Sequence, residues 1–117
     1  MIYYVYILEC DSGKYYTGYT ADIKKRVKQH VTGKGGAKFT RGFRPRNLLA
    51  VWQLSGTRGD AMRVEALVKS KTRVEKTALV RDPSMMIEIL MEKFPEKEFS
   101  AEVFSFDEKI SGIYNFR

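Results

Sequence analysis

Cysteine, histidine and tryptophan each occur only once among the 117 residues, and no stretch approaches the roughly 20 apolar residues that span a bilayer. A lone Cys10 cannot form an internal disulfide or a thiolate metal cluster. The N-terminus also lacks the charged region and apolar segment of a secretion signal. These absences argue against a disulfide-stabilised domain and against a membrane protein, and they favour a cytoplasmic location.

Acidic residues are absent from residues 23–59, a segment with ten basic side chains. These are Lys24, Lys25, Arg26, Lys28, Lys34, Lys38, Arg41, Arg44, Arg46 and Arg58. Such a cluster is typical of proteins that bind nucleic acid, because it displaces the counterions of a phosphate backbone. Acidic residues gather instead near the C-terminus, where residues 82–117 carry eight of them against four basic ones. The alternative is therefore a structural protein whose basic patch binds its own acidic tail.

The apolar content predicts one compact domain, since 44% hydrophobic and 13% aromatic residues are enough for one modest core. Residues 2–9 and 15–20 are rich in aromatic and β-branched side chains, and the turn-forming residues 11–14 separate them. They predict an antiparallel hairpin. The apolar run 48–54 predicts a third strand, central in the sheet, whereas the glycine-rich, basic residues 33–46 predict a mobile loop.

Three helices are expected before the C-terminal extension. Ile23 begins a four-residue apolar repeat that predicts a helix of about ten residues, with Thr20 as N-cap and Asp22 in the first turn. Two capping boxes, one starting at Thr57 and the other at Thr72, predict two further helices that follow each other directly.

Residues 82–117 are expected to form an extension that packs on the domain or on the partner subunit of a homodimer. Asp82 as N-cap and Pro83 in the first turn predict an amphipathic helix that ends at Pro95. Residues 99–103 alternate in hydrophobicity as a short strand does. The apolar side chains that follow are too numerous for a disordered tail.

Side chains able to do chemistry occur early in the chain. Tyr6 and Tyr16 lie in the two predicted hairpin strands, and Arg26 and His30 lie one helical turn apart. Glu65 is placed on the otherwise apolar face of a later helix, where a carboxylate is costly unless it is paired or bound to a cation. Phenols, a guanidinium, an imidazole and a carboxylate together can support phosphodiester cleavage.

The order and spacing of these residues carry a resemblance to a known family. The set consists of Tyr4-Val5-Tyr6, Tyr16-Thr17-Gly18, Arg26, His30, the basic run 33–41 and Glu65. Residues 1–81 thereby resemble the GIY-YIG nucleases, in the small single-domain branch called UPF0213. The resemblance implies an α/β fold of the α+β type, with a three-stranded antiparallel sheet flanked by helices. Tyr4 stands where the family's first motif has glycine, and no asparagine can be aligned downstream of Glu65.

The resemblance implies a catalytic role for five of these side chains, with Glu65 as the metal ligand among them. Tyr6 would activate the attacking water, Tyr16 would hydrogen-bond the water or the phosphate, and Arg26 would clamp the phosphate with its planar guanidinium. A free phenol has a pKa of about 10, so the positive charges of Arg26 and His30 are expected to favour its ionisation. His30 would relay a proton or bind phosphate, with capping of the helix end as an equal alternative. Strand packing is the alternative for both tyrosines, and Gly18 is expected to be architectural.

Glu65 is expected to bind one Mg²⁺ or Mn²⁺, because one carboxylate with water and phosphate oxygens suits a hard divalent ion. The alternative is a salt bridge to Arg63, to Lys69 or to an arginine of the first helix. Contacts with nucleic acid are expected from basic residues of the first helix and the loop after it. These are Lys24, Lys28, Lys34, Lys38, Arg41, Arg44 and Arg46.

The sequence thus predicts a metal-dependent endonuclease that hydrolyses phosphodiester bonds in DNA. The alternative from another class is a non-catalytic nucleic-acid-binding module that retains the GIY-YIG fold. Basic residues report contact with the phosphate backbone and not base readout, so the pattern does not select between duplex, branched and single-stranded substrates, or between DNA and RNA.

Overall fold

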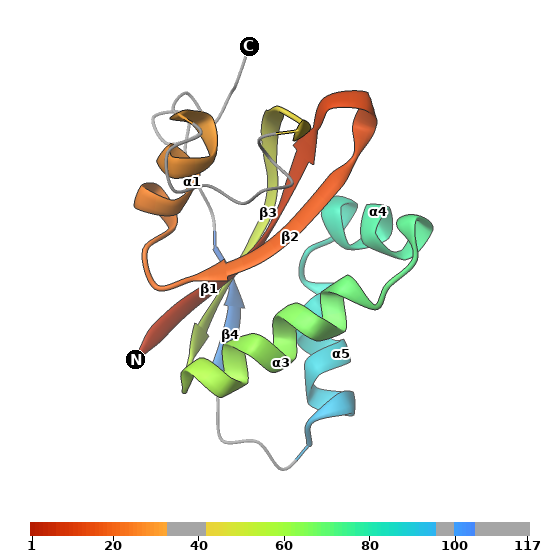
Figure 1. Ribbon diagram of the computed structural model, residues 1–117. Helices are drawn as coiled ribbons and strands as arrows, with labels where there is room; N and C mark the ends of the chain where they lie inside the picture. The colour runs from red at the N-terminus through yellow and green to blue at the C-terminus, as the bar shows by residue number, and fades with distance from the viewer. Residues whose placement is uncertain (33–41, 96–99, 105–117) are drawn as a thin grey trace.

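The computed structural model describes residues 1–32, 42–95 and 100–104, which form one antiparallel sheet and the helices around it (Figure 1). The strands are ordered β2-β1-β3-β4, and they are β1 (Ile2–Cys10), β2 (Tyr15–Thr20), β3 (Pro45–Ser55) and β4 (Ser100–Val103). The longer helices of the described part are α1 (Ile23–Thr32), α3 (Arg58–Lys69), α4 (Arg73–Arg81) and α5 (Met85–Lys93), and a short 3₁₀ helix (Asp11–Gly13) joins β1 to β2. Helix α1 covers one face of the sheet, and α3, α4 and α5 cover the other (Figure 1).

The predicted N-terminal hairpin is confirmed. Strands β1 and β2 pair antiparallel, in a register that sets Tyr6 opposite Gly18. The turn between them is tight because Ser12 and Gly13 adopt φ angles of 61° and 70°, in the left-handed region that glycine enters without strain. The two tyrosine motifs therefore lie side by side at the centre of the hairpin.

The third strand is central, as predicted, but it begins at Pro45, three residues earlier than expected. Asp11 of the hairpin turn stabilises this earlier start of β3. Its carboxylate accepts a hydrogen bond from the backbone N–H of Arg44 at 3.2 Å and from Arg46 Nε at 2.6 Å. The predicted loop is therefore wrong at its C-terminal end, where Pro45 and Arg46 belong to the strand, and its residues 33–41 lie outside the described part of the chain.

The prediction of a three-stranded sheet is wrong, because the C-terminal extension adds a fourth strand. Strand β4 pairs antiparallel with Trp52–Ser55 at the end of β3. The alternating pattern had indicated a short strand here, but a pattern does not say which strand it joins. Beyond β4, the Phe104 N–H donates to the Val51 carbonyl at 2.9 Å, and its ring packs edge to face on Tyr4 at 5.3 Å. The extension thus contacts the first motif strand.

The capping boxes at Thr57 and Thr72 are confirmed. In each, the threonine side chain accepts a hydrogen bond from the third helical N–H, and the carboxylate at that position accepts one from the threonine N–H. The box at Thr72 stops α3 and α4 from merging into one helix, because Thr72 has extended backbone angles between them. The break directs α4 across the same face of the sheet as α3.

Two other predicted N-caps are wrong by two residues each. At the start of α1 it is the Asp22 carboxylate that accepts a backbone hydrogen bond, at 3.1 Å, whereas Thr20 Oγ1 accepts only from the Asp22 N–H. At the start of α5 the N-cap is Ser84 and not Asp82, because a turn through Asp82 and Pro83 precedes the helix. In both places two cap-forming residues stand close together, and local pattern does not rank them.

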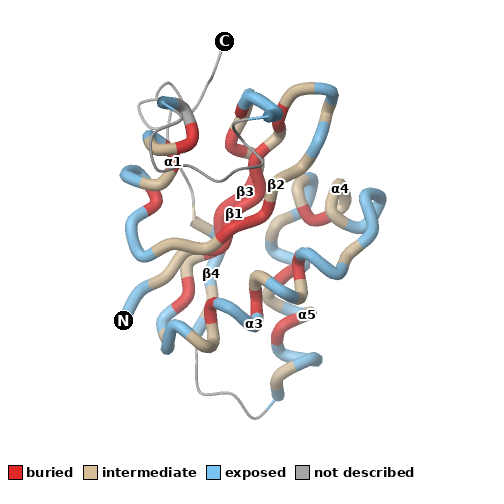
Figure 2. The backbone as a smooth tube through the Cα atoms, viewed as in Figure 1, coloured by how far each residue is buried: buried red, intermediate tan, exposed pale blue. Residues whose placement is uncertain are grey.

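Alternating residues of β1 and β3 supply two separate cores, and both strands are buried along their middle (Figure 2). The core under α3, α4 and α5 consists of Val5, Ile7, Ala50, Trp52, Leu54, Ala61, Val64, Val68, Leu79, Met86 and Leu90. The core under α1 consists of Tyr6, Leu8, Cys10, Ile23, Val27, Leu48 and Val51. Within the described residues, none of the helices has the length and apolarity needed to cross a bilayer.

Candidate active site

Tyr6 and His30 form the buried centre of the face that α1 covers. Their side chains are at most 1% exposed, and Tyr6 Oη lies 2.9 Å from His30 Nε2. The sheet places Tyr6 in the middle of β1, and the apolar stripe of α1 turns His30 toward it, because His30 follows the buried Val27 by three residues. Two predicted site residues that lie 24 positions apart in the sequence thereby share a hydrogen bond.

Gly18 makes room for the Tyr6 ring where it crosses the edge strand. A Cβ atom at Gly18 would stand 2.5 Å from Tyr6 Oη, 2.8 Å from Tyr6 Cζ and 3.1 Å from Tyr16 Cε1. Such distances are far inside van der Waals contact, and a close-packed interior leaves the ring little room to move. Any side chain at Gly18 would therefore displace the Tyr6 hydroxyl.

Tyr16 completes a cluster of three rings. Its ring centroid lies 6.2 Å from that of Tyr6 and 5.1 Å from that of His30, and Tyr6 and His30 are themselves 5.9 Å apart. The contacts with His30 are edge to face, the arrangement that aromatic pairs favour. Tyr16 is only half-buried, so it is the ring of this cluster closest to solvent.

Arg26 is half-buried beside these rings. Burial lowers the pKa of Arg26, but its hydrogen bonds with Tyr6 and Tyr16 outweigh burial and hold the pKa above its usual value. The guanidinium also donates from Nη1 to Gln29 Oε1 at 3.1 Å. Gln29 was missed by the sequence argument, although its position three residues after Arg26 on one helix is a signal for such a contact.

Burial decides the charge state of the central pair. Burial, and after it the charge of Tyr16, raises the pKa of Tyr6 well above its usual value, although the Arg26 hydrogen bond and charge lower it. Burial, and after it Arg26, lowers the pKa of His30 from 6.5 to about 4. Both groups are therefore neutral at neutral pH. Arg26 acts on the phenol as expected, but the neutral His30 adds no positive field, and a neutral imidazole gains nothing from the helix dipole.

Glu65 lies on α3, which packs against β1 and β2. Its side chain is 19% exposed, and its Oε1 lies 3.1 Å from Nζ of Lys69, one turn later. This is one of the salt bridges expected as an alternative to metal binding. Lys69 is 54% exposed, so the pair is solvated, and helical pairs of this kind contribute only about 0.3–0.5 kcal/mol. The Glu65 charge also helps to raise the pKa of the Tyr6 phenol, although α3, which carries Glu65, covers the opposite face of the sheet from α1.

Comparison with known proteins identifies the family. Residues 2–78 match the model of the GIY-YIG catalytic domain. The chain belongs to the GIY-YIG family. The match covers both tyrosine motifs, the Tyr6, Tyr16, Arg26 and His30 cluster, and Glu65, and the family is one of nucleases. The resemblance drawn from the sequence is confirmed.

Several relatives of this GIY-YIG chain bear the name UPF0213. UPF0213 protein BH0048 of Halalkalibacterium halodurans is 50% identical over 80 residues, which are 68% of this chain and 83% of that protein. UPF0213 protein VNG_2274C of Halobacterium salinarum is 42% identical over 78 residues, which are 67% of this chain and 99% of that protein. The solution NMR structure of BH0048 from Bacillus halodurans is 49% identical, with a TM-score of 0.42, and covers 69% of this chain and 84% of that one. These names state no activity.

The chemistry of the Glu65 carboxylate is compatible with a divalent ion that keeps much of its water shell. Within residues 1–32, 42–95 and 100–104, no three His, Cys, Asp or Glu side chains come together as a protein-built metal site. Glu65 supplies a single carboxylate that is partly exposed. Because Mg²⁺ is commonly held by one or two carboxylates with water and phosphate oxygens, Glu65 could hold Mg²⁺ or Mn²⁺ together with the substrate.

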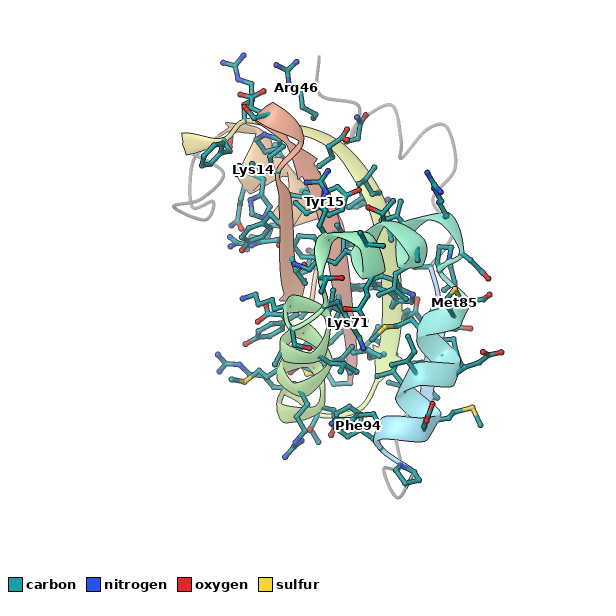
Figure 3. The ribbon with its side chains drawn as sticks, turned by 90° about the vertical axis from the view of Figure 1, so that its right-hand side faces the viewer. Lys14, Tyr15, Arg46, Lys71, Met85 and Phe94 are labelled. Carbon is teal, nitrogen blue, oxygen red and sulfur yellow. The ribbon has the colours of Figure 1, made fainter. Side chains whose placement is uncertain are left out.

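The basic residues expected to contact nucleic acid differ in their surroundings. Lys24 and Lys28 are exposed on α1, on the helix that carries Arg26 and His30. Arg44 and Arg46 are also exposed, but Arg46 is ion-paired with Asp11 at the hairpin-turn end of the sheet (Figure 3). The three remaining members of the set lie outside the described residues, and these are Lys34, Lys38 and Arg41.

Proposed function

We propose that this GIY-YIG protein is a metal-dependent endonuclease that hydrolyses phosphodiester bonds in DNA. The observation that supports it most directly is the contact between Tyr6 and His30 over Gly18, with Arg26 bonded to the same phenol and the Glu65 charge acting on its pKa. Phosphodiester hydrolysis needs an activated water, neutralised phosphate oxygens and help for the leaving oxygen. The cluster holds a candidate group for each of these tasks.

Tyr6 and His30 are proposed to move the proton of the attacking water. Tyr6 Oη takes a proton from water while its own proton passes along the 2.9 Å hydrogen bond to His30 Nε2. The water oxygen forms its bond to phosphorus as the bond from phosphorus to the leaving sugar oxygen breaks. This concerted route avoids a free phenolate, which burial disfavours in the resting protein. The neighbouring phosphate, being negative, favours the imidazolium that forms.

Arg26 is proposed to bind the phosphate on which the water acts. Its guanidinium is always charged and presents a planar fork that matches two phosphate oxygens. Gln29 and the two phenols hold it in place before substrate arrives, so little side-chain entropy is lost on binding. Tyr16, the more exposed phenol, is proposed to hydrogen-bond the same phosphate or the water.

Glu65 is proposed to hold the metal ion, Mg²⁺ or Mn²⁺. When bound, the ion supplies positive charge to the phosphate and to the leaving oxygen. The Lys69 ammonium pairs with the carboxylate in the free protein. Because that pair is solvated and weak, exchange of the ammonium for a metal ion costs little.

Nucleic acid as the substrate is supported by Lys24 and Lys28, which are exposed on α1, the helix that also carries Arg26. We also propose that residues 1–81 are the nuclease domain, since the family match ends at residue 78. Residues 82–117 are then an added extension, which completes the sheet through β4. Association of two copies through this extension remains a prediction, which sedimentation equilibrium would test.

Plasmid nicking tests the proposed function. Purified protein should nick supercoiled DNA with Mg²⁺ or Mn²⁺ and not with EDTA, and Glu65→Gln should abolish nicking. Glu92→Gln is the matched control, because Glu92 is an exposed glutamate at the far end of α5. It should nick at the wild-type rate.

Two outcomes would contradict the proposal in different ways. If the wild-type protein binds DNA but never nicks it with either metal, the non-catalytic binding module is correct. If nicking occurs but survives Glu65→Gln, the protein is a nuclease whose metal ligand lies elsewhere.

A further inference from the structure

Arg58, the first residue of α3, is held by a tyrosine of the edge strand and not by a carboxylate. Its Nε donates to Tyr19 Oη at 3.0 Å, and the side chain is exposed. A guanidinium has five N–H donors, so this bond leaves the four donors of the two terminal amino groups for another acceptor. Because the tyrosine fixes the guanidinium from behind, a ligand would meet an oriented fork.

Three other exposed arginines have protein partners that account for their charge or position. Arg46 pairs with Asp11, Arg63 pairs with Asp60, and Arg73 stacks over the Tyr15 ring at 3.8 Å. These contacts give the three arginines a structural role. For Arg58, the described residues supply no carboxylate partner.

The position of Arg58 on α3 is also unfavourable for the helix itself. A cation in the first turn opposes the helix dipole, which favours negative charge there. The capping box at Thr57 and Asp60 supplies the expected negative partner at this end. Stability of α3 therefore gives no reason for an arginine at this residue, and a ligand of opposite charge does.

Arg58 lies in line with the proposed metal ligand. Arg58 and Glu65 are seven residues apart, which is two helical turns, so their side chains leave α3 within about 20° of the same direction and about 10.5 Å apart along its axis. Tyr19, which holds Arg58, directly follows Gly18 on the edge strand β2. The Tyr6 hydroxyl lies on Gly18. Tyr19 faces the α3 side of the sheet, opposite to Tyr6, so Arg58 lies at the edge of β2 on the same side as Glu65.

We propose that Arg58 is a second phosphate-binding residue, which contacts the backbone of the nucleic-acid strand where it runs along the edge of β2 away from the scissile bond. This proposal rests on the proposed function. Because Arg58 lies about 10.5 Å along α3 from Glu65, its ligand is a phosphate near the scissile one on the same strand and not the scissile phosphate itself. Its ligand is a phosphodiester, and base identity does not matter.

Binding without metal tests the proposal separately from cleavage. Fluorescence anisotropy in EDTA, with a labelled 20-base-pair duplex, should show about tenfold weaker binding for Arg58→Ala, because a charged hydrogen-bonded contact is lost. The slope of log affinity against log salt should also fall by about 0.9, the value for one phosphate contact. Arg63→Ala is the matched control, since it removes one exposed arginine of the same helix about 140° around its axis. It should leave the slope within error.

Two further variants separate charge from orientation. Arg58→Lys should keep the salt slope but bind about threefold more weakly, because an ammonium cannot form the planar fork. Tyr19→Phe should do the same, since it keeps the charge of Arg58 but removes the bond that orients it. Thermal melting of each variant verifies folding, and a variant with a lowered melting temperature is measured below its transition.

A neutral methylphosphonate, placed at one phosphate at a time, then locates the contact. Where the methylphosphonate replaces the phosphate that Arg58 binds, the affinity of the wild-type protein should fall. The affinity of Arg58→Ala should show no further loss at that position. The position should lie close to the nick made with Mg²⁺ but not at it.

The outcomes distinguish the two proposals. Equal salt slopes for Arg58→Ala, Arg63→Ala and wild type would overturn the role of Arg58 while leaving nucleic-acid binding intact. Absence of any wild-type binding would instead overturn the proposed function, and the role of Arg58 with it. Binding that depends on Arg58 without any nicking would support the phosphate contact and contradict only the catalytic part.

Discussion

The two faces of the sheet use the same strands for opposite purposes. On the side of α3, α4 and α5, β1 and β3 bury only apolar side chains and Trp52, whose single polar atom donates to the Pro83 carbonyl at 2.8 Å. On the side of α1, the same strands bury a phenol against an imidazole, with a guanidinium beside them. Burying titratable groups costs stability unless each is paired. The apolar face therefore stabilises the fold. The α1 face lowers that stability, because it buries Tyr6 and His30 with pKa values far from their usual ones.

Trp52→Ala should break the apolar face and give the largest loss of stability. Truncating a fully buried aromatic side chain costs about 3–5 kcal/mol in the free energy of unfolding. Tyr6→Phe, on the other face, removes one hydroxyl and leaves His30 Nε2 without its partner from Tyr6, which costs about 1–3 kcal/mol. Urea denaturation followed by circular dichroism measures both without relying on tryptophan fluorescence. A larger loss for Tyr6→Phe would contradict the assignment of the two faces.

Acidification should weaken the α1 face selectively. The pKa of His30 is about 4 in the folded protein, below the usual 6.5, so the unfolded chain binds the proton more readily. The contribution of His30 to the free energy of unfolding is therefore fully present above pH 6.5. It declines by about 3 kcal/mol in total as the pH falls to about 4. Urea denaturation at pH 7, 5.5 and 4.5 measures this decline.

His30→Gln supplies the control for that pH dependence. The variant cannot titrate in this window, so its stability should change little between pH 6.5 and 4.5, whatever its value at pH 7. The lowered pKa values of Asp11 and Glu75 affect stability mainly at more acidic pH, because carboxyl groups take up protons there. An unchanged slope in His30→Gln would show that other groups cause the decline.

Gly18→Ala should sharpen the comparison by testing how tightly the α1 face packs. The added Cβ would stand 2.5 Å from Tyr6 Oη, and overpacking of this kind costs about 1–3 kcal/mol. In a Tyr6→Ala background the same change should cost much less, because the obstructing ring is gone. Gly59→Ala is the control, since its Cβ would meet nothing closer than 3.4 Å, and alanine is a better helix former. Equal costs of Gly18→Ala in both backgrounds would contradict the packing of Tyr6 on this glycine.

Local signals in the sequence were sufficient for much of the fold. The hairpin, the central third strand and the capping boxes at Thr57 and Thr72 were predicted correctly, because turn residues and caps act between residues close in the chain. The wrong caps of α1 and α5 also show the limit of local reading. Where two cap-forming residues stand two positions apart, the backbone conformation that leads into the helix decides which of them is the N-cap.

Long-range contacts account for what the sequence left undecided. Pairing of β4 with β3 joins residues about 50 positions apart, and no local pattern names that partner. The order of Tyr6, Tyr16, Arg26, His30 and Glu65 was enough to name the family, because motif order is a property of the chain. Only tertiary packing decided that His30 is buried and neutral, that Tyr6 needs the space over Gly18, and that the largely buried Glu65 pairs with the exposed Lys69. Burial and charge at a site depend on every element packed around it, so they follow from the folded arrangement and not from residue identity.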